Sequence, residues 1–290
     1  MNFLDEPIET LLSAWMMELT DSDPPDNEPL LSLRRAWTRQ DNIKRARGVH
    51  QAAVERQYRA ERDLLAQEAV LNEARVAQVE AFLNHPAGLC TVAIQPQHPI
   101  KALLSSQDLK SKIDRIRVSG SSTFPSYHAE TVPGGLLFSE FSVLSGWRRC
   151  QQIYTNGLIY ETRNTTIRRD GKEHLNWGGL AERLALSLKF SQNLLAAAEY
   201  YDGITVSVFL DEMQCCIIPP LISGYRDHIF ALLPSYSWEF KFSAENWVQS
   251  KAIKESYIDI FSELCWGLGF GEMTPDQIKT CIGSILPLLS

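Results

Sequence analysis

The chain lacks the short motifs that mark the common catalytic classes. It contains no Gly-x-x-x-x-Gly-Lys-Ser/Thr loop, no Gly-x-Ser-x-Gly turn and no His-Glu-x-x-His helix, which serve phosphate binding, serine hydrolysis and zinc proteolysis. The glycines at 267, 269 and 271 follow a predicted helix, whereas a dinucleotide fingerprint follows a strand, so we interpret them as a helix end. The sequence therefore predicts no catalytic residue and no cofactor.

Cysteine and histidine are few and dispersed. The six cysteines, at 90, 150, 215, 216, 265 and 281, form no Cys-x-x-Cys pair, and the six histidines are equally scattered. Zinc sites need such ligands at short spacings. We therefore expect no metal site, and we expect buried free thiols in a reducing cytoplasm.

Long apolar runs are also missing. The longest uncharged ones, Cys215–Ile222 and Cys281–Leu289, are far shorter than the ~20 residues of a membrane-spanning helix. The acidic start has no basic n-region of a secretory signal. We expect no membrane partner, and the 44% hydrophobic and 22% charged residues are typical of a soluble globular protein.

Basic residues are absent from the first 30 positions, which carry eight acids and therefore a charge of -8. Residues 34–62 carry nine bases against three acids, a charge of +6. An asymmetry of this kind indicates intermolecular contacts or a tail that masks its own chain.

Within the acidic stretch, residues 5–19 predict one amphipathic helix, capped by Asp5 and with Pro7 in its first turn. A proline-rich linker follows the helix. We therefore predict that residues 1–30 form an acidic docking helix with a flexible linker. Its apolar face could cover the protein's own core or enter a groove on a partner. The residues predicted to bind a partner are Leu11, Leu12, Trp15, Met16 and Leu19.

Residues 31–88 predict a long helix or helical hairpin, because Leu31–Asn84 has no proline and one glycine, Gly48. Alanine recurs at heptad spacing, at 46, 53, 60, 74 and 81. This row favours a weak coiled coil, which would pair with another subunit or a second copy. The alternative is two helices folded against the C-terminal domain, with a break near Gly48.

Residues 89–290 predict a mixed α/β recognition domain, so the expected fold class is α+β with a helical or coiled-coil segment in front. Short apolar runs bounded by turns indicate strands. Asn156-Gly157 between two β-prone runs predicts a hairpin, and Asp170-Gly171 predicts a second turn. Helices are expected over 178–201, 244–268 and 275–285.

The basic part of the long helix has two interpretations. Lys and Arg neutralise phosphates and so favour nucleic-acid binding, but the chain as a whole is acidic. A charged, solvated helix, or one that pairs with acidic residues such as the N-terminal tail or an acidic partner, is therefore favoured over nucleic acid. The residues predicted to make either contact are Arg34, Arg35, Arg39, Lys44, Arg45 and Arg47.

One pattern supports an enzyme as an alternative hypothesis. Glu239 and Lys241 lie two residues apart and so share one face of a predicted strand. Metal-dependent nucleases place an acid and a lysine in this way, with an upstream aspartate as second metal ligand. Asp211 or Asp227 would be that aspartate. The simpler interpretation is an exposed strand edge that carries alternating charges.

The order of features from Trp147 to Pro275 is similar to a known protein family. A strand with the hairpin (Gln152–Glu161) precedes a leucine-rich helix, a strand after Gly203, a Leu-Leu-Pro segment at Leu232–Pro234, and a helix with Phe261-x-x-Leu264-x-Trp266-x-x-Gly269. This order resembles the C-terminal accessory region of bacterial proteins that carry a Schlafen-type AlbA domain, an assumed nucleic-acid- or ATP-binding domain. The long helix stands in place of the AlbA-type core, so the resemblance implies no catalytic residue. It implies a bacterial cytoplasmic recognition or assembly module.

These observations together favour a non-enzymatic adaptor or sensor subunit of a bacterial multiprotein assembly. The tethered apolar helix and the alanine row indicate protein contacts, and no catalytic constellation competes with them. By analogy with the family, the partner would be an ATPase or nuclease encoded nearby, and the setting would be anti-phage defence.

Overall fold

The fold is that of a computed structural model, which describes residues 28–67, 88–98, 102–119, 123–125, 128–142, 147–214, 216–221, 229–271 and 273–290. The helices are α2 (Glu28–Gln67), α4 (Ser106–Ile116), α5 (Trp177–Ala197), α6 (Ala244–Trp247), α7 (Ser250–Cys265) and α8 (Pro275–Ile282), with a π-helical turn η2 (Trp266–Phe270) and a 3-10 turn η3 (Leu286–Leu289). The strands are β1 (Leu89–Pro96), β2 (Val118–Ser119), β3 (Thr123–Phe124), β4 (Glu130–Val132), β5 (Gly135–Ser142), β6 (Trp147–Tyr154), β7 (Ile159–Asn164), β8 (Thr166–Arg169), β9 (Lys172–Leu175), β10 (Ile204–Asp211), β11 (Ile217–Ile218), β12 (Ile229–Phe230) and β13 (Tyr236–Phe242).

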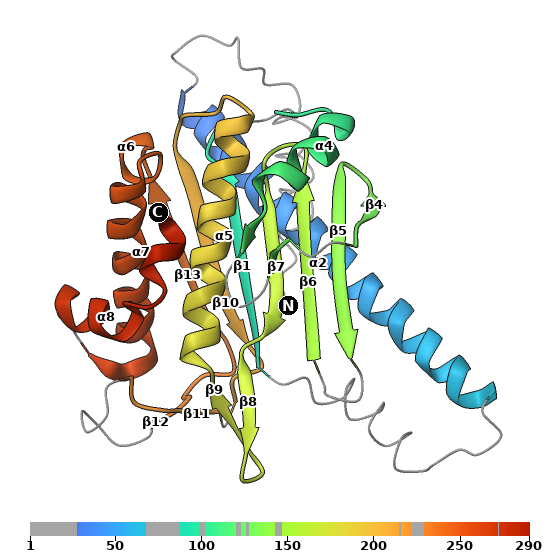
Figure 1. The fold of residues 1–290 in the computed structure, drawn as a ribbon, viewed down its shortest axis with the longest axis vertical. Helices are drawn as coiled ribbons and strands as arrows, with labels where there is room; N and C mark the ends of the chain where they lie inside the picture. The colour runs from blue at the N-terminus through green and yellow to red at the C-terminus, as the bar shows by residue number, and fades with distance from the viewer. Residues whose placement is uncertain are drawn as a thin grey trace, which may run out of the picture.

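A seven-stranded antiparallel sheet organises the fold, in the order β13-β10-β1-β7-β6-β5-β4. Its central strand pair alternates between two covered faces. Val92 and Ile94 of β1 and Val206 and Val208 of β10 belong to the core under α5, whereas Ala93 faces α2. A second, four-stranded sheet, β12-β11-β9-β8, extends below the main one (Figure 1).

The main core lies between one face of the sheet and helices α5, α7 and α8 (Figure 1). Helix α5 begins at Asn176, whose side chain accepts a hydrogen bond from the backbone N–H of Gly179, and its buried leucines pack on the sheet. A buried polar contact also joins α5 to the sheet. The carboxylate of Glu161 on β7 accepts hydrogen bonds of 3.0 Å from Ser187 of α5 and from Gln151 of β6.

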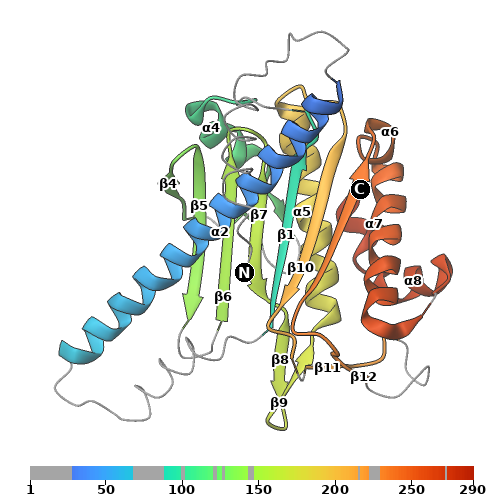
Figure 2. The ribbon, with the colours of Figure 1, turned by 180° about the vertical axis from the view of Figure 1, so that it is seen from behind.

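Helix α2 crosses the opposite face of the sheet diagonally (Figure 2). Ala46 packs there against Ala93, Leu158 and Tyr160, and Ala53 packs against a neighbouring cluster on β5 and β6. Both alanines are at least 96% buried, with 0% and 4% exposure. Their small side chains let the helix backbone approach the sheet closely.

The expected fold class, α+β with a helical or coiled-coil segment in front of a separate domain, is wrong. The described part of the chain contains no coiled coil, because alanines 46 and 53 of the heptad row are covered by the sheet and not by another helix. The large antiparallel sheet with α2 across it replaces the expected separate helical segment. The helix also runs without a break through Gly48, where a Cβ would meet nothing within 4 Å.

The two predicted turns are confirmed, whereas other predictions concern residues outside the described part of the chain. Asn156-Gly157 closes the β6–β7 hairpin and Asp170-Gly171 closes β8–β9, with positive φ at both glycines. The predicted docking helix, with Leu11, Leu12, Trp15, Met16 and Leu19, and the alanines at 74 and 81 lie outside the described residues. The domain limits 1–30, 31–88 and 89–290 remain predictions. Among the described helices, none is both long and apolar enough to cross a membrane.

Candidate binding groove between helix α2 and the sheet

A groove of about 530 Å³ separates one flank of α2 from the sheet. Clefts that hold ligands typically measure about 300–1,000 Å³. Helix α2 supplies one wall, and strands β10 and β13 supply the floor and the other wall. The lining side chains and backbone belong to Gln40, Ile43, Lys44, Arg47, Ser207, Phe209, Ser237, Trp238 and Glu239.

Secondary-structure periodicity brings these residues together. Positions 40, 43, 44 and 47 lie on one side of a helix, since residues three and four apart are neighbours. On the sheet, Ser207 pairs with Glu239 and Phe209 with Ser237, so all four project toward α2. The alternate residues of β10, Val206 and Val208, face the main core.

The groove carries more positive than negative charge. Arg47 lies 4.0 Å from the carboxylate of Asp211 at the end of β10, and its guanidinium lies 5.6 Å from the ring centre of Phe209. Lys241 lies 3.6 Å from Glu239. Lys44 is exposed and forms no ion pair within the described ranges, so its charge is in excess.

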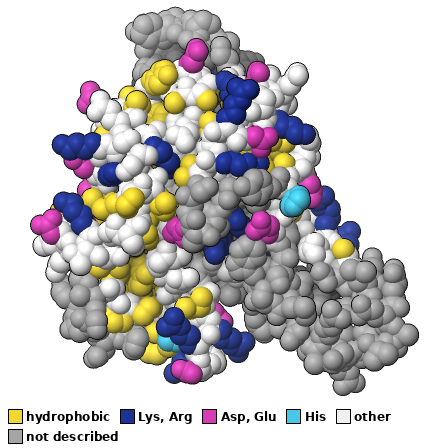
Figure 3. Space-filling view, viewed as in Figure 1, with side chains coloured by type: hydrophobic (Ala, Val, Ile, Leu, Met, Phe, Trp, Pro, Cys, Tyr) yellow, Lys and Arg dark blue, Asp and Glu magenta, His cyan; other side chains and the backbone are white. Residues whose placement is uncertain are grey.

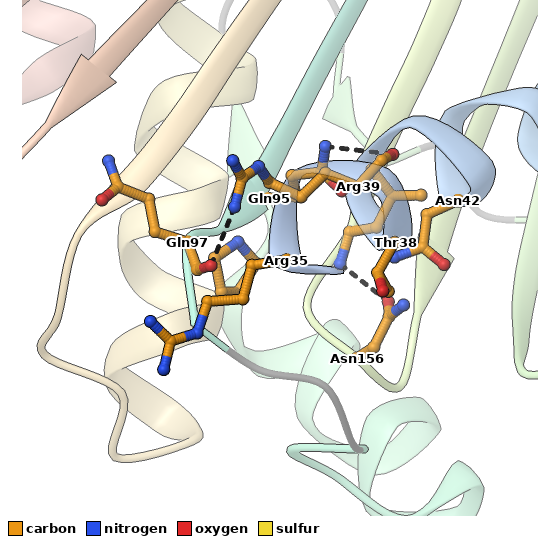
Figure 4. Close-up of a pocket in the computed structure, with 9 residues that line it drawn as sticks. Arg35, Thr38, Arg39, Asn42, Gln95, Gln97 and Asn156 are labelled. Carbon is orange, nitrogen blue, oxygen red and sulfur yellow. Dashed lines mark hydrogen bonds between the residues drawn. The ribbon is translucent and has the colours of Figure 1, made fainter. Parts of the chain in front are cut away.

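A seam on the other flank of α2 fixes the helix to the sheet (Figure 4). Arg39 donates a hydrogen bond of 3.0 Å to the carbonyl of Gln97, and the Gln95 amide donates one of 3.3 Å to the carbonyl of Arg39. Burial lowers the pKa of Arg39, while the nearby Glu239 acts in the opposite direction. Arg39 of the seam therefore interacts electrostatically with Glu239 of the groove.

The seam leaves a small cavity of about 10 Å³, which is room for about one water molecule. Arg35, Thr38 and Asn42 of α2 line it with Asn156, whose side chain accepts a hydrogen bond from the backbone of Leu158 (Figure 4). This cavity is too small for a ligand. Its function is structural, because it lies where the helix and the hairpin meet.

A buried histidine follows the groove on α2. His50 is 7% exposed. Burial first, and then the positive charges of Arg148 and Arg47, lower its pKa from 6.5 to about 4. The imidazole is therefore neutral at pH 7, and its Nε2 atom is buried without a hydrogen-bond partner among the described residues.

The predicted basic residues divide among different surroundings on α2. Lys44 and Arg47 line the groove, and Arg35 and Arg39 line the seam. Arg45 is exposed and pairs with Asp41 one turn earlier. Arg34 is half-buried near the start of the helix. The helix thus does not present these residues as one continuous basic stripe.

The acid and lysine of the nuclease hypothesis do share one face of β13, at the edge of the sheet. Their expected aspartate is not near them. Glu239 pairs with Ser207, which is four residues from Asp211, and at about 3.3 Å per residue this is about 13 Å. A single metal ion cannot bridge that span, and Asp227 lies outside the described residues.

Within the described part of the chain, no group of three or more His, Cys, Asp or Glu residues is arranged to hold a metal ion. On strand β10, sequence reasoning missed the groove residues Ser207 and Phe209. Their signal was the alternation in Ile204–Asp211, where every second residue faces α2.

Comparisons with protein families, curated proteins and solved structures found no match. No model of a protein family matches the chain, and neither a curated protein nor a solved structure is similar enough to count as a match.

Proposed function

We propose that the protein is a non-enzymatic adaptor or sensor subunit of a bacterial assembly, with helix α2 as its contact element. The supporting observation is that α2 has two parts with different surroundings. Its first part is fixed on the sheet through Arg39 and Ala46. Its last part projects past the edge of the sheet (Figures 1 and 2).

The projecting part begins near Arg56, whose guanidinium lies 3.1 Å from Glu130 on the edge strand β4. The following 57–67 extend for roughly 16 Å at 1.5 Å per residue, and Arg59 and Ala60 on this arm are exposed. This segment continues a helix that is already anchored on the sheet, so it can present its exposed residues to another molecule. An arm of this kind supports contact with a partner.

The cytoplasmic and defence settings are part of the same proposal. Cys90, Cys150, Cys216 and Cys265 are buried free thiols, which favours a reducing compartment. The defence setting and the choice of an ATPase or nuclease as partner rest on the family resemblance alone.

Site-specific photo-crosslinking tests the proposal. A benzoylphenylalanine residue placed at Arg59 of the full chain should yield, in cells, one discrete cross-linked protein that is identified by mass spectrometry. The matched control places the same group at Lys251, whose side chain is 89% exposed on α7. Equal products from both positions, no product, or a product made only of two copies of this chain would overturn the adaptor function.

A further inference from the structure

We propose that the groove between α2 and strands β10 and β13 binds an acidic peptide segment of a partner protein. This inference rests on the proposed adaptor function and names the chemistry of one partner. Three independent features of the groove carry it: its charge, its apolar floor and the strand edge beside it.

The charge of the groove fits carboxylates. Glu239 in the groove and Asp211 next to it each already have a cation within 4.0 Å, and Lys44 adds a positive charge that neither carboxylate neutralises. The Arg47–Asp211 pair is also weak, because both side chains are at least 41% exposed and such pairs contribute little. An incoming carboxylate can therefore recruit both Lys44 and Arg47.

The floor of the groove fits an apolar side chain. Ile43 and Phe209 are only partly buried, and both line the groove. The Phe209 ring lies beneath the Arg47 guanidinium, so a bound aromatic or aliphatic side chain would cover apolar surface next to a cation. An acidic segment with one apolar anchor satisfies both features at once.

The strand edge fits an extended backbone. Strand β13 is the end strand of the seven-stranded sheet and pairs with β10 on one side. An added peptide strand would pair with its outer edge through main-chain hydrogen bonds. Every second side chain of that strand would then lie on the α2 side of the sheet, toward the groove.

A random peptide library displayed against the full chain tests this inference. The groove variant is Lys44→Glu/Arg47→Glu. The matched control is Arg168→Glu/Arg169→Glu, which changes the charge equally at two exposed residues of the β8–β9 hairpin, where Figure 3 shows basic side chains (dark blue) at the bottom of the opposite face. Enriched peptides should be rich in Asp and Glu around an aromatic or aliphatic residue.

The selected peptides should bind the wild-type chain and the hairpin control equally, and bind the groove variant about tenfold more weakly or worse. Their affinity should also fall as salt is added. If thermal unfolding shows that the groove variant is not folded, Lys44→Gln/Arg47→Gln replaces it. Peptides without acidic enrichment, or peptides that bind the groove variant equally well, overturn the inference.

A labelled oligo-dT strand provides the competing measurement. If that strand binds the wild-type chain, loses binding in the groove variant, and no peptide is enriched, the groove belongs to nucleic acid and the inference is wrong. Failure of the inference is separate from failure of the adaptor function. A partner cross-linked at Arg59 without any selected peptide would contradict the groove assignment alone.

Discussion

Gln152 on strand β6 donates a hydrogen bond of 2.7 Å from its amide nitrogen to the backbone carbonyl of Ala46 on helix α2. Neither residue is exposed to solvent. The same Gln152 side chain accepts a hydrogen bond from the Tyr154 hydroxyl. One buried amide thus connects the helix, the strand and the hairpin, and it fixes the wall of the groove over the sheet.

Replacing this amide should loosen the helix. Gln152→Ala removes a partner from a buried carbonyl and from the Tyr154 hydroxyl and leaves a cavity, so we expect the free energy of unfolding to fall by about 2 kcal/mol. Urea denaturation followed by tryptophan fluorescence measures it. Gln51→Ala is the control, since Gln51 is exposed on the same helix and bonds to the exposed Glu55; its effect should stay within ~0.5 kcal/mol. Equal effects of the two changes would contradict this role.

The buried His50 should make stability depend on pH. Its folded pKa of about 4 lies below its ordinary 6.5, so the unfolded chain binds the proton more readily. Stability from this group is therefore complete above pH 6.5 and is lost as the pH falls toward 4. The full loss is roughly 3 kcal/mol, at 1.36 kcal/mol per pH unit.

The measurement compares the wild-type chain with His50→Gln by urea denaturation between pH 4.5 and 7.5. The other histidines and the carboxylates are common to both proteins, so the difference between the two curves isolates His50. The wild-type chain should lose more stability than the variant as the pH falls from 6.5. Parallel curves would show that His50 is accessible to solvent protons in the folded state.

Local patterns in the sequence were sufficient for much of the fold. Asn156-Gly157 predicted its hairpin correctly, although only Gly157 of the pair has positive φ, at +84°. The expected positive φ at both turn positions occurs in the other turn, at Asp170 and Gly171. The leucine spacing after Gly178 predicted α5, which runs over Trp177–Ala197. Such features depend on a few adjacent residues.

The position of α2 depends on contacts that are distant in sequence. Small residues at heptad spacing suit a neighbouring helix and a flat sheet equally well, so the alanine row could not tell one from the other. The sheet that covers Ala46 is built from Ala93, Leu158 and Tyr160, at least 47 positions away. The groove was missed for the same reason, since Phe209 and Arg47 meet only after both elements have packed.

Two turn glycines should differ in the cost of an added methyl group. Gly157 and Gly171 both have positive φ, at +84° and +74°, which costs a residue with a Cβ about 1 kcal/mol or slightly more. A Cβ at Gly157 would also lie 2.8 Å from Pro96 and 3.0 Å from Leu195, whereas nothing lies within 4 Å of one at Gly171.

Gly157→Ala should therefore lower the free energy of unfolding by about 3 kcal/mol, because overpacking adds to the backbone cost. Gly171→Ala should lower it by about 1 kcal/mol. Thermal and urea unfolding of both variants measure the difference. If the two changes cost the same, the hairpin does not pack against Pro96 and Leu195 as the structure shows.

Two carboxylates near Arg149 should differ in how much they contribute to the free energy of unfolding, because one is buried and the other is not. Glu161 is 2% exposed and lies 3.8 Å from Arg149 and 3.6 Å from Arg183, while Glu140 is 40% exposed and lies 3.4 Å from Arg149. The pKa of Arg149 is lowered by burial first and by the charge of Arg183 second, while the charges of Glu161 and then Glu140 act in the opposite direction without cancelling the shift. Glu161→Gln should therefore lower the free energy of unfolding by about 3 kcal/mol, and Glu140→Gln by less than ~1 kcal/mol.

Urea denaturation at pH 7 in low and high salt measures both losses. Only the small loss from Glu140→Gln should be reduced by salt. A larger loss from Glu140→Gln would mean that the exposed carboxylate, and not the buried one, balances the arginines between α5 and the sheet.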